Sequence, residues 1–586
     1  MFSPKKALTV LVALVLSISI TSAAQGVVDE QFVGSPPSDV RRIPYYGFYA
    51  NGLGAFPANF NFLVGFKADG SVMNESKVTG VGACQSLADE NCKGAQLIRY
   101  RAIIGLCENK DSTDCIQDIR VTKDQGEQIA FSREEVFPPS NSDHFTGDSK
   151  IGLPSGRSAP IISIPTLAHS GGNKYLVLVT YESFRLPNST FFEPPQIKAA
   201  IYGTKLNSTP ISGPGIQTNL RFYDKLSLSM DGWSNPSTSC PIYGLFGCAE
   251  RYELPIGVNF GLTLKLSRPV KGWLHGRIND VDSKITIDSA GSQVISIDGK
   301  PLVLPTVYSW VKKENAPDSI ARYYETLPKP LGGNGYGCLD ALDAQDCGAR
   351  PANLWVSVMR DALPDTPSMQ EFLAWLPHLG DKATSAPTIW RVESMQNSGE
   401  SDACYSSAQS LSGFVSTNAT QYISGPPVFN RNDQALDYKV AAPHYLPNGK
   451  EFLGSYDLII SSSVARCLYG FSEAPISASV SVTSADGKEK VATTVLGEKD
   501  GWLSLSAKGF TFSSPTIRVK LEQKTEKAPV VEPSPQPTAI PESQQTQAQP
   551  KPAFKQSKKS ITCIKGKNVK KVSGTNPKCP VGFKKK

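Results

Sequence analysis

Short runs of β-branched and aromatic residues, many of them alternating with polar ones, dominate the hydrophobic pattern of this chain. Clusters of Gly, Pro, Asn and Asp separate these runs, an arrangement typical of strands joined by turns. Parallel α/β folds would instead need regular intervening helices. The pattern therefore predicts a mainly β protein. The clearest strand candidates are residues 175–181, 260–266, 285–287, 456–462 and 476–482.

Two segments carry the signals of short helices. Residues 318–326 begin at Asp318, which can cap a helix, and residues 367–376 follow a possible cap at Thr366 with Pro367 in the first helical position. The second segment is short and has few basic groups, so we expect a structural strut rather than a membrane or partner-binding helix. We expect only these two segments to be helical.

The order of these patterns predicts a multidomain β-sandwich architecture, immunoglobulin-like, with a few short helices, disulfide-stapled loops and a disordered linker. The linker contains seven prolines among Gln, Ser and Thr and cannot bury a core. The predicted parts are a signal peptide at 1–24, a β-rich domain at 40–315 that is long enough for two subdomains, a connecting region with both helices at 316–399, a β-sandwich domain at 400–524, the linker at 528–558 and a basic Cys-paired tail at 559–586.

The first residues have the pattern of a secretory signal peptide. Lys5 and Lys6 precede an apolar stretch at residues 7–20, and small residues follow at 21–24, so we expect cleavage after Ala24. The apolar stretch is too short for a stable membrane span, and we expect none elsewhere. The sequence thus predicts an extracellular protein.

Twelve cysteines, an even number, fit an exported protein whose thiols oxidise. Most of them form closely spaced pairs beside turn-forming residues, as expected of disulfides that close loop tips. Zinc sites favour shorter spacings and usually histidine, so we predict no metal there. The sequence leaves the connectivity open. The pairs that we expect are Cys84 with Cys92, Cys107 with Cys115, Cys240 with Cys248, Cys338 with Cys347, Cys404 with Cys467, and Cys563 with Cys579.

Charge is strongly segregated along the chain. The whole sequence carries +7, but residues 551–586 contain twelve lysines and no acidic residue, and the signal segment holds two more lysines. Residues 25–550 therefore carry −7. A basic tail on an acidic body is an electrostatic signature that the overall charge conceals.

The basic tail predicts a binding site for polyanions. We expect short strands at residues 561–564 and 570–572, with a bridge between Cys563 and Cys579 that holds the lysines in an array. Lysine is a mobile point charge, so such an array suits anionic polymers without demanding one geometry. The expected contact residues are Lys565, Lys567, Lys570, Lys571, Lys578, Lys584, Lys585 and Lys586.

Outside a cell, the partner that we expect is an anionic cell-envelope polymer or an acidic glycan. Nucleic acid is not expected, because no arginine or stacking aromatic residue is interleaved with these lysines, although Phe583 is present. The alternative is a solubilising tail without a partner.

The tail also resembles a lysine-rich C-terminal motif of varied secreted actinobacterial proteins, in which it typically follows a Pro-rich linker. The matching pattern is ITC-x-KGK-x3-KV-x4-PKCP-x-G-[FY]-KKK over residues 561–586, and residues 469–471 and 474–520 are similar to the terminal β domain of some of those proteins. The resemblance implies an exported, cell-associated protein. It supplies no catalytic residue and no cofactor.

No catalytic signature stands out in the chain. The five histidines are scattered, without a zinc-protease motif, and neither a Gly-x-Ser-x-Gly elbow nor a phosphate-binding loop is present. We therefore predict no catalytic residue, no cofactor and no metal, and consider an enzyme less favoured than a binding protein.

Three local alternatives stay open. Asp280 and Asp282 could serve as a glycosidase pair or bind calcium, although such spacing is also common on a solvated strand edge. Asp111 and Asp114 could bind calcium as well. Trp233, Trp273 and Trp502 each follow a glycine and could expose a glycan-binding surface, but burial in a sandwich core is the commoner use of tryptophan.

These observations predict a secreted, envelope-associated protein with a structural, adhesion or binding role, held at the surface by its lysine-rich tail. The alternative is an extracellular polysaccharide hydrolase with accessory β domains. A cleft lined by two carboxylates and several tryptophans would favour the hydrolase. The sequence leaves the ligand and the oligomeric state open.

Overall fold

Among the residues that it describes, the computed structural model is mainly β, with 52% strand and 10% helix, which confirms the mainly β class predicted from the alternating pattern. The predicted signal segment and linker lie outside the residues that it describes. These are residues 36–51, 61–67, 84–139, 144–210, 220–224, 227–230, 240–244, 246–325, 333–338, 355–395, 403–406, 410–472, 476–483, 489–491, 495–512, 516–523, 559–565, 568–574, 579 and 583–585.

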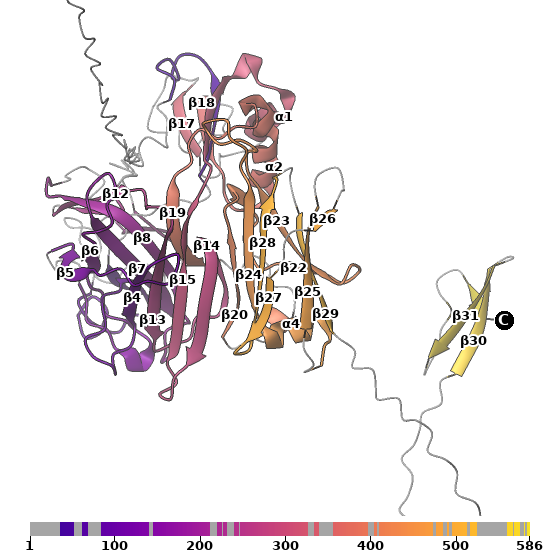
Figure 1. Ribbon diagram of the computed structural model, residues 1–586, viewed down its shortest axis with the longest axis horizontal. Coiled ribbons are helices and arrows are strands. Elements are labelled where there is room, and N and C mark those ends of the chain that lie inside the picture. The colour runs from indigo at the N-terminus through magenta and orange to yellow at the C-terminus, as the bar shows by residue number, and fades with distance from the viewer. Residues whose placement is uncertain are drawn as a thin grey trace, which may run out of the picture. The chain divides into compact units, whose positions relative to one another are not determined.

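The chain divides into two compact units, Met1–Lys524 and Thr525–Lys586. The first unit contains two β-sandwiches and a small sheet covered by helices (Figure 1). The second contains a three-stranded sheet.

Two sheets with a common core form the first sandwich. Side chains from both sheets, such as Val177 and Leu262, meet in one buried cluster. One sheet runs β2 (Phe62–Phe66), β3 (Leu97–Ile103), β7 (Lys174–Arg185), β8 (Gln196–Asn207) and β19 (Thr388–Ser394). The other runs β4 (Cys115–Lys123), β13 (Val258–Leu266), β15 (Gln293–Val303) and the distal part of β14 (Gly272–Ile287).

Strand β7 lies in the interior of this sandwich, and its apolar side chains contribute to two buried clusters. Tyr175 and Val177 face the core between the two sheets, whereas Leu176 and Leu178 face a second cluster on the outer side. A continuous rather than alternating apolar run is expected of a strand buried on both faces. The strands around it are β5 (Ser132–Phe137), β6 (Ala159–Ser163), β11 (Ile242–Gly244) and β12 (Gly247–Tyr252), and a separate hairpin comprises β9 (Leu220–Asp224) and β10 (Ser227–Met230).

The second sandwich continues from the same sheet. Its two sheets enclose a core that includes Leu458 and Leu505 on one side and Leu436 and Val519 on the other. The first sheet adds β20 (Leu411–Thr417), β24 (Gly454–Ser461), β28 (Trp502–Phe510) and β27 (Val495–Lys499) to β14. The second contains β21 (Gln421–Tyr422), β22 (Val428–Asn430), β23 (Ala435–Ala441), β29 (Thr516–Gln523), β25 (Ile476–Thr483) and β26 (Glu489–Val491).

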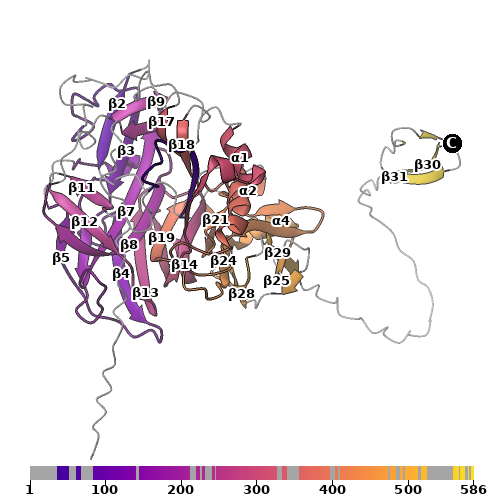
Figure 2. The ribbon, with the colours of Figure 1, turned by 90° about the horizontal axis from the view of Figure 1, so that it is seen from above.

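Strand β14 joins the two sandwiches, and Figure 2 shows it between β19 and β24. Its first residues pair with β19 and, in parallel, with β20, and its later residues pair with β15. Side chains alternate along a strand, so Trp273 enters the core of the second sandwich and Leu274 that of the first. The predicted β regions 40–315 and 400–524 thus share one hydrogen-bonded sheet.

A buried polar seam accompanies β14 on the side of the second sandwich. His275 stacks on Tyr422 with ring centroids 3.9 Å apart, and the Arg277 guanidinium lies 4.6 Å from the centroid of the same ring. Arg277 donates hydrogen bonds to the carbonyls of Thr417 (2.8 Å) and Ala419 (2.6 Å). Burial, with the charges of Arg277 and Arg391, lowers the pKa of His275 far below its usual range.

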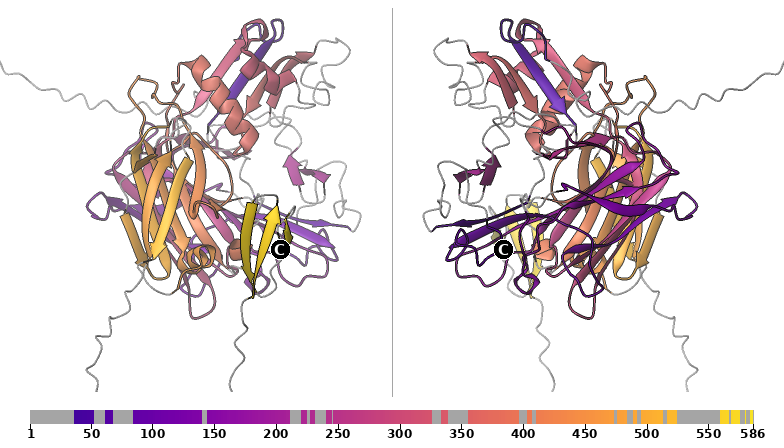
Figure 3. Two further views of the ribbon diagram at one scale, coloured as in Figure 1. Left: turned by 90° about the vertical axis from the view of Figure 1, so that its right-hand side faces the viewer. Right: turned by 90° about the vertical axis from the view of Figure 1, so that its left-hand side faces the viewer.

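A smaller sheet with helices packed on it completes the first unit (Figure 3). Phe48 and Val358 from the sheet contact Phe372 and Trp375 from a helix in one apolar cluster. Its strands are β16 (Val307–Lys312), β1 (Tyr45–Ala50), β18 (Trp355–Asp361) and β17 (Gly333–Cys338), and its helices are α1 (Asp318–Glu325) and α2 (Thr366–Trp375). In the described part of the chain, 3-10 turns lie at Ser149–Ile151, Lys313–Asn315 and Leu376–Leu379.

Both predicted helices are present, with one correction to their ends. Asp365 rather than Thr366 caps α2, because its carboxylate accepts the hydrogen bond from the Ser368 amide (2.8 Å). The expectation of only two helices was wrong. The described residues include α3 (Ala403–Ser406) and α4 (Ser462–Tyr469), which the disulfide between Cys404 and Cys467 links.

None of the helices in the described ranges is long and apolar enough to cross a membrane.

Packing at the sandwich junction predicts a strong effect of one methyl group. A Cβ at Gly413 of β20 would lie 2.2 Å from the ring of Trp273, so Gly413→Ala should lower the free energy of unfolding by about 1–3 kcal/mol through overpacking. Gly497→Ala is the matched control, since a Cβ there meets no atom within 4 Å. Chemical denaturation measures both. Equal stabilities of the two variants would contradict the packing described for β14.

Titration of His275 predicts a pH-dependent difference. Its pKa is depressed in the folded state, so its contribution to stability is present above the unfolded value of about 6.5 and is lost as the pH falls below it. His275→Phe should keep the stacking on Tyr422. Below pH 6.5, the unfolding free energy of this variant should rise relative to that of the native protein by up to about 1.4 kcal/mol per pH unit. Unfolding free energies at pH 5 and 7.5 test this. A constant difference between the two proteins would refute it.

Candidate functional site

Four predicted disulfides are confirmed: Cys84 with Cys92, Cys107 with Cys115, Cys240 with Cys248, and Cys404 with Cys467. The first three each close a loop with a sequence separation of 8. The predicted pairs of Cys338 with Cys347 and Cys563 with Cys579 include side chains outside the described part of the chain, although Cys579 is disulfide-bonded.

Two of these loops frame a pocket in the first sandwich. Gln85 follows Cys84 and Leu106 precedes Cys107, and both line a pocket of about 670 Å³. The Thr146 amide donates to the Gln85 carbonyl (2.7 Å), which ties the first loop to the pocket wall. The lining residues are Gln85, Gly105, Leu106, Val136, His144, Phe145, Thr146, Ser155, Gly156, Arg157, Ser158 and Pro160.

The floor of this pocket is held by backbone hydrogen bonds. The Arg157 amide donates to the Ile103 carbonyl (2.9 Å), and the buried Asn61 side chain donates to the Arg157 carbonyl (2.9 Å) while accepting from the Ile103 amide (2.6 Å). Gly156 is required there, because a Cβ would lie 2.6 Å from the ring of Phe145. The sequence thus places Arg157 at a fixed backbone position.

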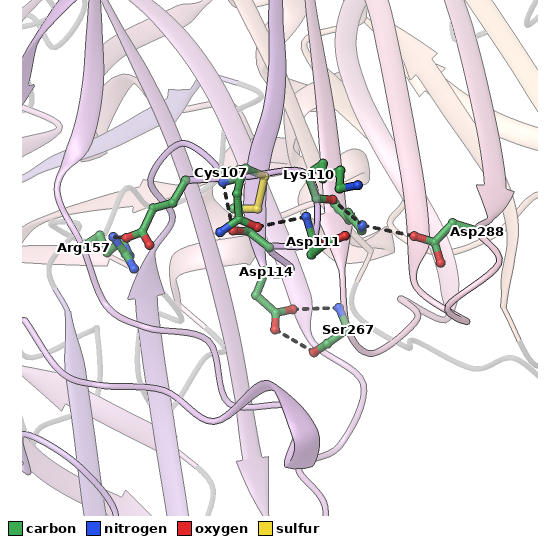
Figure 4. Close-up of a disulfide and its surroundings, with 12 residues drawn as sticks. Cys107, Lys110, Asp111, Asp114, Arg157, Ser267 and Asp288 are labelled. Carbon is green, nitrogen blue, oxygen red and sulfur yellow. Dashed lines mark hydrogen bonds and ion pairs between the residues drawn. A yellow bond between two sulfur atoms is a disulfide. The ribbon is translucent and has the colours of Figure 1, made fainter.

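The disulfide loop at residues 107–115 positions a carboxylate against Arg157 (Figure 4). Glu108 forms an ion pair with the Arg157 guanidinium (2.6 Å). The far end of the loop is anchored by Asp114, whose carboxylate accepts from the amide (3.0 Å) and hydroxyl (2.6 Å) of Ser267. Lys265 donates to the Lys110 carbonyl (3.1 Å), so the loop is fixed from two sides.

His144 and Ser158 form a pair inside the pocket that could be mistaken for a catalytic dyad. His144 Nε2 lies 3.0 Å from Ser158 Oγ, and the Ser158 hydroxyl donates to the Pro138 carbonyl (2.7 Å). Since a serine hydroxyl has one proton, the imidazole must be the donor in this arrangement. The histidine therefore does not act as a base toward Ser158, and the pair suits binding better than nucleophilic catalysis.

The possible glycosidase pair at Asp280 and Asp282 gains no support from the geometry. Asp280 lies at a bulge of β14 with φ of 54° and forms ion pairs with Lys300 (3.1 Å) and Lys508. Burial opposes its charged form, but the hydrogen bonds from Lys508 and Lys300 outweigh burial and lower its pKa. A general acid needs the opposite shift. Asp280 instead links β14, β15 and β28.

The structure also bears on the proposed tryptophan surface and on the calcium candidates. Trp273 is 1% exposed and belongs to the core, as the commoner use of tryptophan predicts, so it cannot contribute to a glycan-binding surface. Trp502 packs, partly buried, against apolar core residues, and Trp233 lies outside the described residues. Within the described ranges, no three His, Cys, Asp or Glu side chains converge as a metal site requires, and Asp114 is engaged by Ser267.

The basic tail contains the strands that the sequence predicted. β30 (Lys559–Lys565) pairs on one side with β31 (Asn568–Gly574) and on the other with β32 (Lys584–Lys585), all antiparallel. The register puts Lys570 and Lys585 directly opposite Cys563 on its two sides. Of the predicted contact residues, Lys565, Lys570, Lys571, Lys584 and Lys585 lie in these strands, and Lys567, Lys578 and Lys586 lie outside the described residues.

Comparison of the chain with models of known protein families and with curated proteins gives no match. The structure therefore defines the protein by its own features: a mainly β, disulfide-linked body with a framed pocket, and a separate basic three-stranded sheet.

Sequence reasoning missed the pocket. The polar loop at residues 141–156 carries no catalytic or binding signature. His144 lies in this loop, and Arg157 and Ser158 follow it. The signal that could have found them is the spacing of Cys84, Cys92, Cys107 and Cys115, which marks two rigid loops but not their proximity.

Loop closure predicts a ranking of disulfide contributions. Replacing Cys107 and Cys115 by serine removes a link of sequence separation 8 and should lower the free energy of unfolding by about 2–3 kcal/mol. Replacing Cys404 and Cys467, with separation 63, should lower it by about 4 kcal/mol, because a longer loop gains more chain entropy when released. Urea denaturation of both double variants tests the order. A larger loss from the short loop would contradict it.

Proposed function

We propose that the protein is exported and acts at the cell envelope in a binding or adhesion role, with its basic terminal sheet holding an anionic polymer. The observation that carries this proposal is the pairing of β30 with β31 and β32 in a segment that has twelve lysines and no acid over residues 551–586. A regular sheet presents its charges at fixed backbone positions. A tail that only increases solubility would not require a folded sheet.

Preorganisation gives the sheet an advantage over a flexible tail. Ordering side chains and loops on binding costs free energy, and a prefolded element avoids part of that cost. Lys570 and Lys585 lie on the two outer strands at the level of Cys563, so one polymer strand crossing the sheet could contact both. Cys579, which is disulfide-bonded, gives the segment a covalent tie in place of a large core.

The body of the chain supports the proposed location. Its disulfides between Cys84 and Cys92, Cys107 and Cys115, Cys240 and Cys248, and Cys404 and Cys467 are typical of oxidising compartments. Residues 25–550 carry −7, so long-range electrostatics favours the tail over the body as the point of attachment to an anionic polymer. A membrane span is not part of this proposal.

Neutralising the terminal sheet tests the proposal. The quadruple variant Lys570→Gln, Lys571→Gln, Lys584→Gln and Lys585→Gln should bind a glycerol-phosphate wall polymer or heparin at least tenfold more weakly than the native chain at 0.1 M salt. The affinity of the native chain should fall steeply with salt, because screening weakens attraction between exposed charges. Biolayer interferometry with immobilised polymer measures both effects.

Four exposed lysines of the body serve as the matched control: Lys93, Lys123, Lys150 and Lys499. Their replacement by glutamine removes the same charge from the whole chain and should leave binding nearly unchanged. Equal losses in the two quadruple variants would mean that net charge, not the terminal sheet, determines binding. No binding by the native chain would favour the solubilising tail.

A further inference from the structure

We propose that the pocket beside Arg157 binds a sugar that carries one anionic group, either a carboxylate or a phosphate. This site goes beyond the proposed attachment to a polymer. It belongs to the first sandwich, uses none of the tail lysines, and would take a small ligand rather than a polymer.

The charge of the pocket favours an anion. Among the described residues that line it, Arg157 and His144 are the ionisable groups, and none carries a carboxylate. The planar guanidinium of arginine can donate two parallel hydrogen bonds to a carboxylate or phosphate. His144 offers a second polar edge, held by Ser158 at 3.0 Å.

The present partner of Arg157 is one that a ligand can displace. The Arg157 side chain is 47% exposed and that of Glu108 is 64% exposed. Exposed ion pairs of this kind contribute little net free energy, because water screens both charges. An anion that enters the pocket therefore has to displace only one weak contact of the guanidinium.

The remaining lining suits a sugar better than a simple anion or an acyl chain. Leu106, Val136 and Pro160 provide aliphatic surface for the C–H face of a sugar ring, and Val136 is 51% exposed. Thr146 and Ser155 provide hydroxyls, and Ser155 accepts from the Gly147 amide (3.0 Å), which leaves its own proton to donate. A volume of about 670 Å³ falls within the usual range for small-ligand sites and far exceeds the size of one inorganic anion.

The frame of the pocket limits the cost of binding. Gln85 adjoins one disulfide and Leu106 the other, and Asn61 fixes the backbone on both sides of the floor. Such a site is largely preformed, so less free energy is lost in ordering it around a ligand.

Calorimetric titration of the full chain with D-glucuronate, glucose 6-phosphate and glucose tests the proposal. At least one anionic sugar should bind, and glucose should bind at least tenfold more weakly. Arg157→Gln should lower the affinity for the anionic sugar at least tenfold. Glu108→Gln should raise the affinity for the anionic sugar about threefold, because it removes the competing carboxylate. A gain of affinity cannot arise from misfolding.

Arg133→Gln is the matched control, since Arg133 is also a surface arginine in an ion pair, with Asp118, but does not line the pocket. Its affinity should equal that of the native chain. Comparison of glucuronate with glucose 6-phosphate shows which anionic group the site prefers. The proposal is overturned if neither anionic sugar binds at millimolar concentration, if glucose binds equally well, or if Arg157→Gln and Glu108→Gln have no effect.

Discussion

The fold depends on one strand that belongs to two sandwiches. β14 places Trp273 in one core and Leu274 in the other, and its pairing changes from β19 and β20 to β15 along its length. A strand shared in this way must be compatible with both cores at once. This explains why Gly413 lies against the ring of Trp273 and why Arg277 is bonded to two backbone carbonyls.

The shared strand also determines where function can lie. The centre of the first unit is occupied by buried side chains, including the stacked pair of His275 and Tyr422, so its polar groups serve packing. Asp280, which the sequence offered as a candidate catalytic carboxylate, forms ion pairs with two lysines at the bulge of the same strand. The two binding sites that we propose, the pocket beside Arg157 and the terminal sheet, use other parts of the chain.

Sequence reasoning succeeded where a local pattern determines the structure. The apolar run at residues 175–181 specifies a strand, the turn signals around residues 318–326 and 367–376 specify two short helices, and the close cysteine pairs specify loop-closing disulfides, each through nearby residues alone. It failed where the outcome depends on distant residues. α4 begins directly after β24, at the end of the run 456–462 that the pattern assigned to a strand; no side-chain hydrogen bond caps it at Ser461, and the disulfide of Cys467 with Cys404 ties it to α3. The pocket brings together segments that are far apart in the sequence, as the hydrogen bond from the Arg157 amide to the Ile103 carbonyl shows, and no local pattern could indicate this.

The two units suggest a division of roles, with attachment in the terminal sheet and recognition in the body. The most direct test of attachment is cell fractionation with a salt wash, comparing the native chain with one truncated after Lys527. The native chain should sediment with the envelope and elute at high salt, while the truncated chain should go to the medium. If both forms are equally free in the medium, or both stay with the envelope, the basic terminal sheet is not the attachment element.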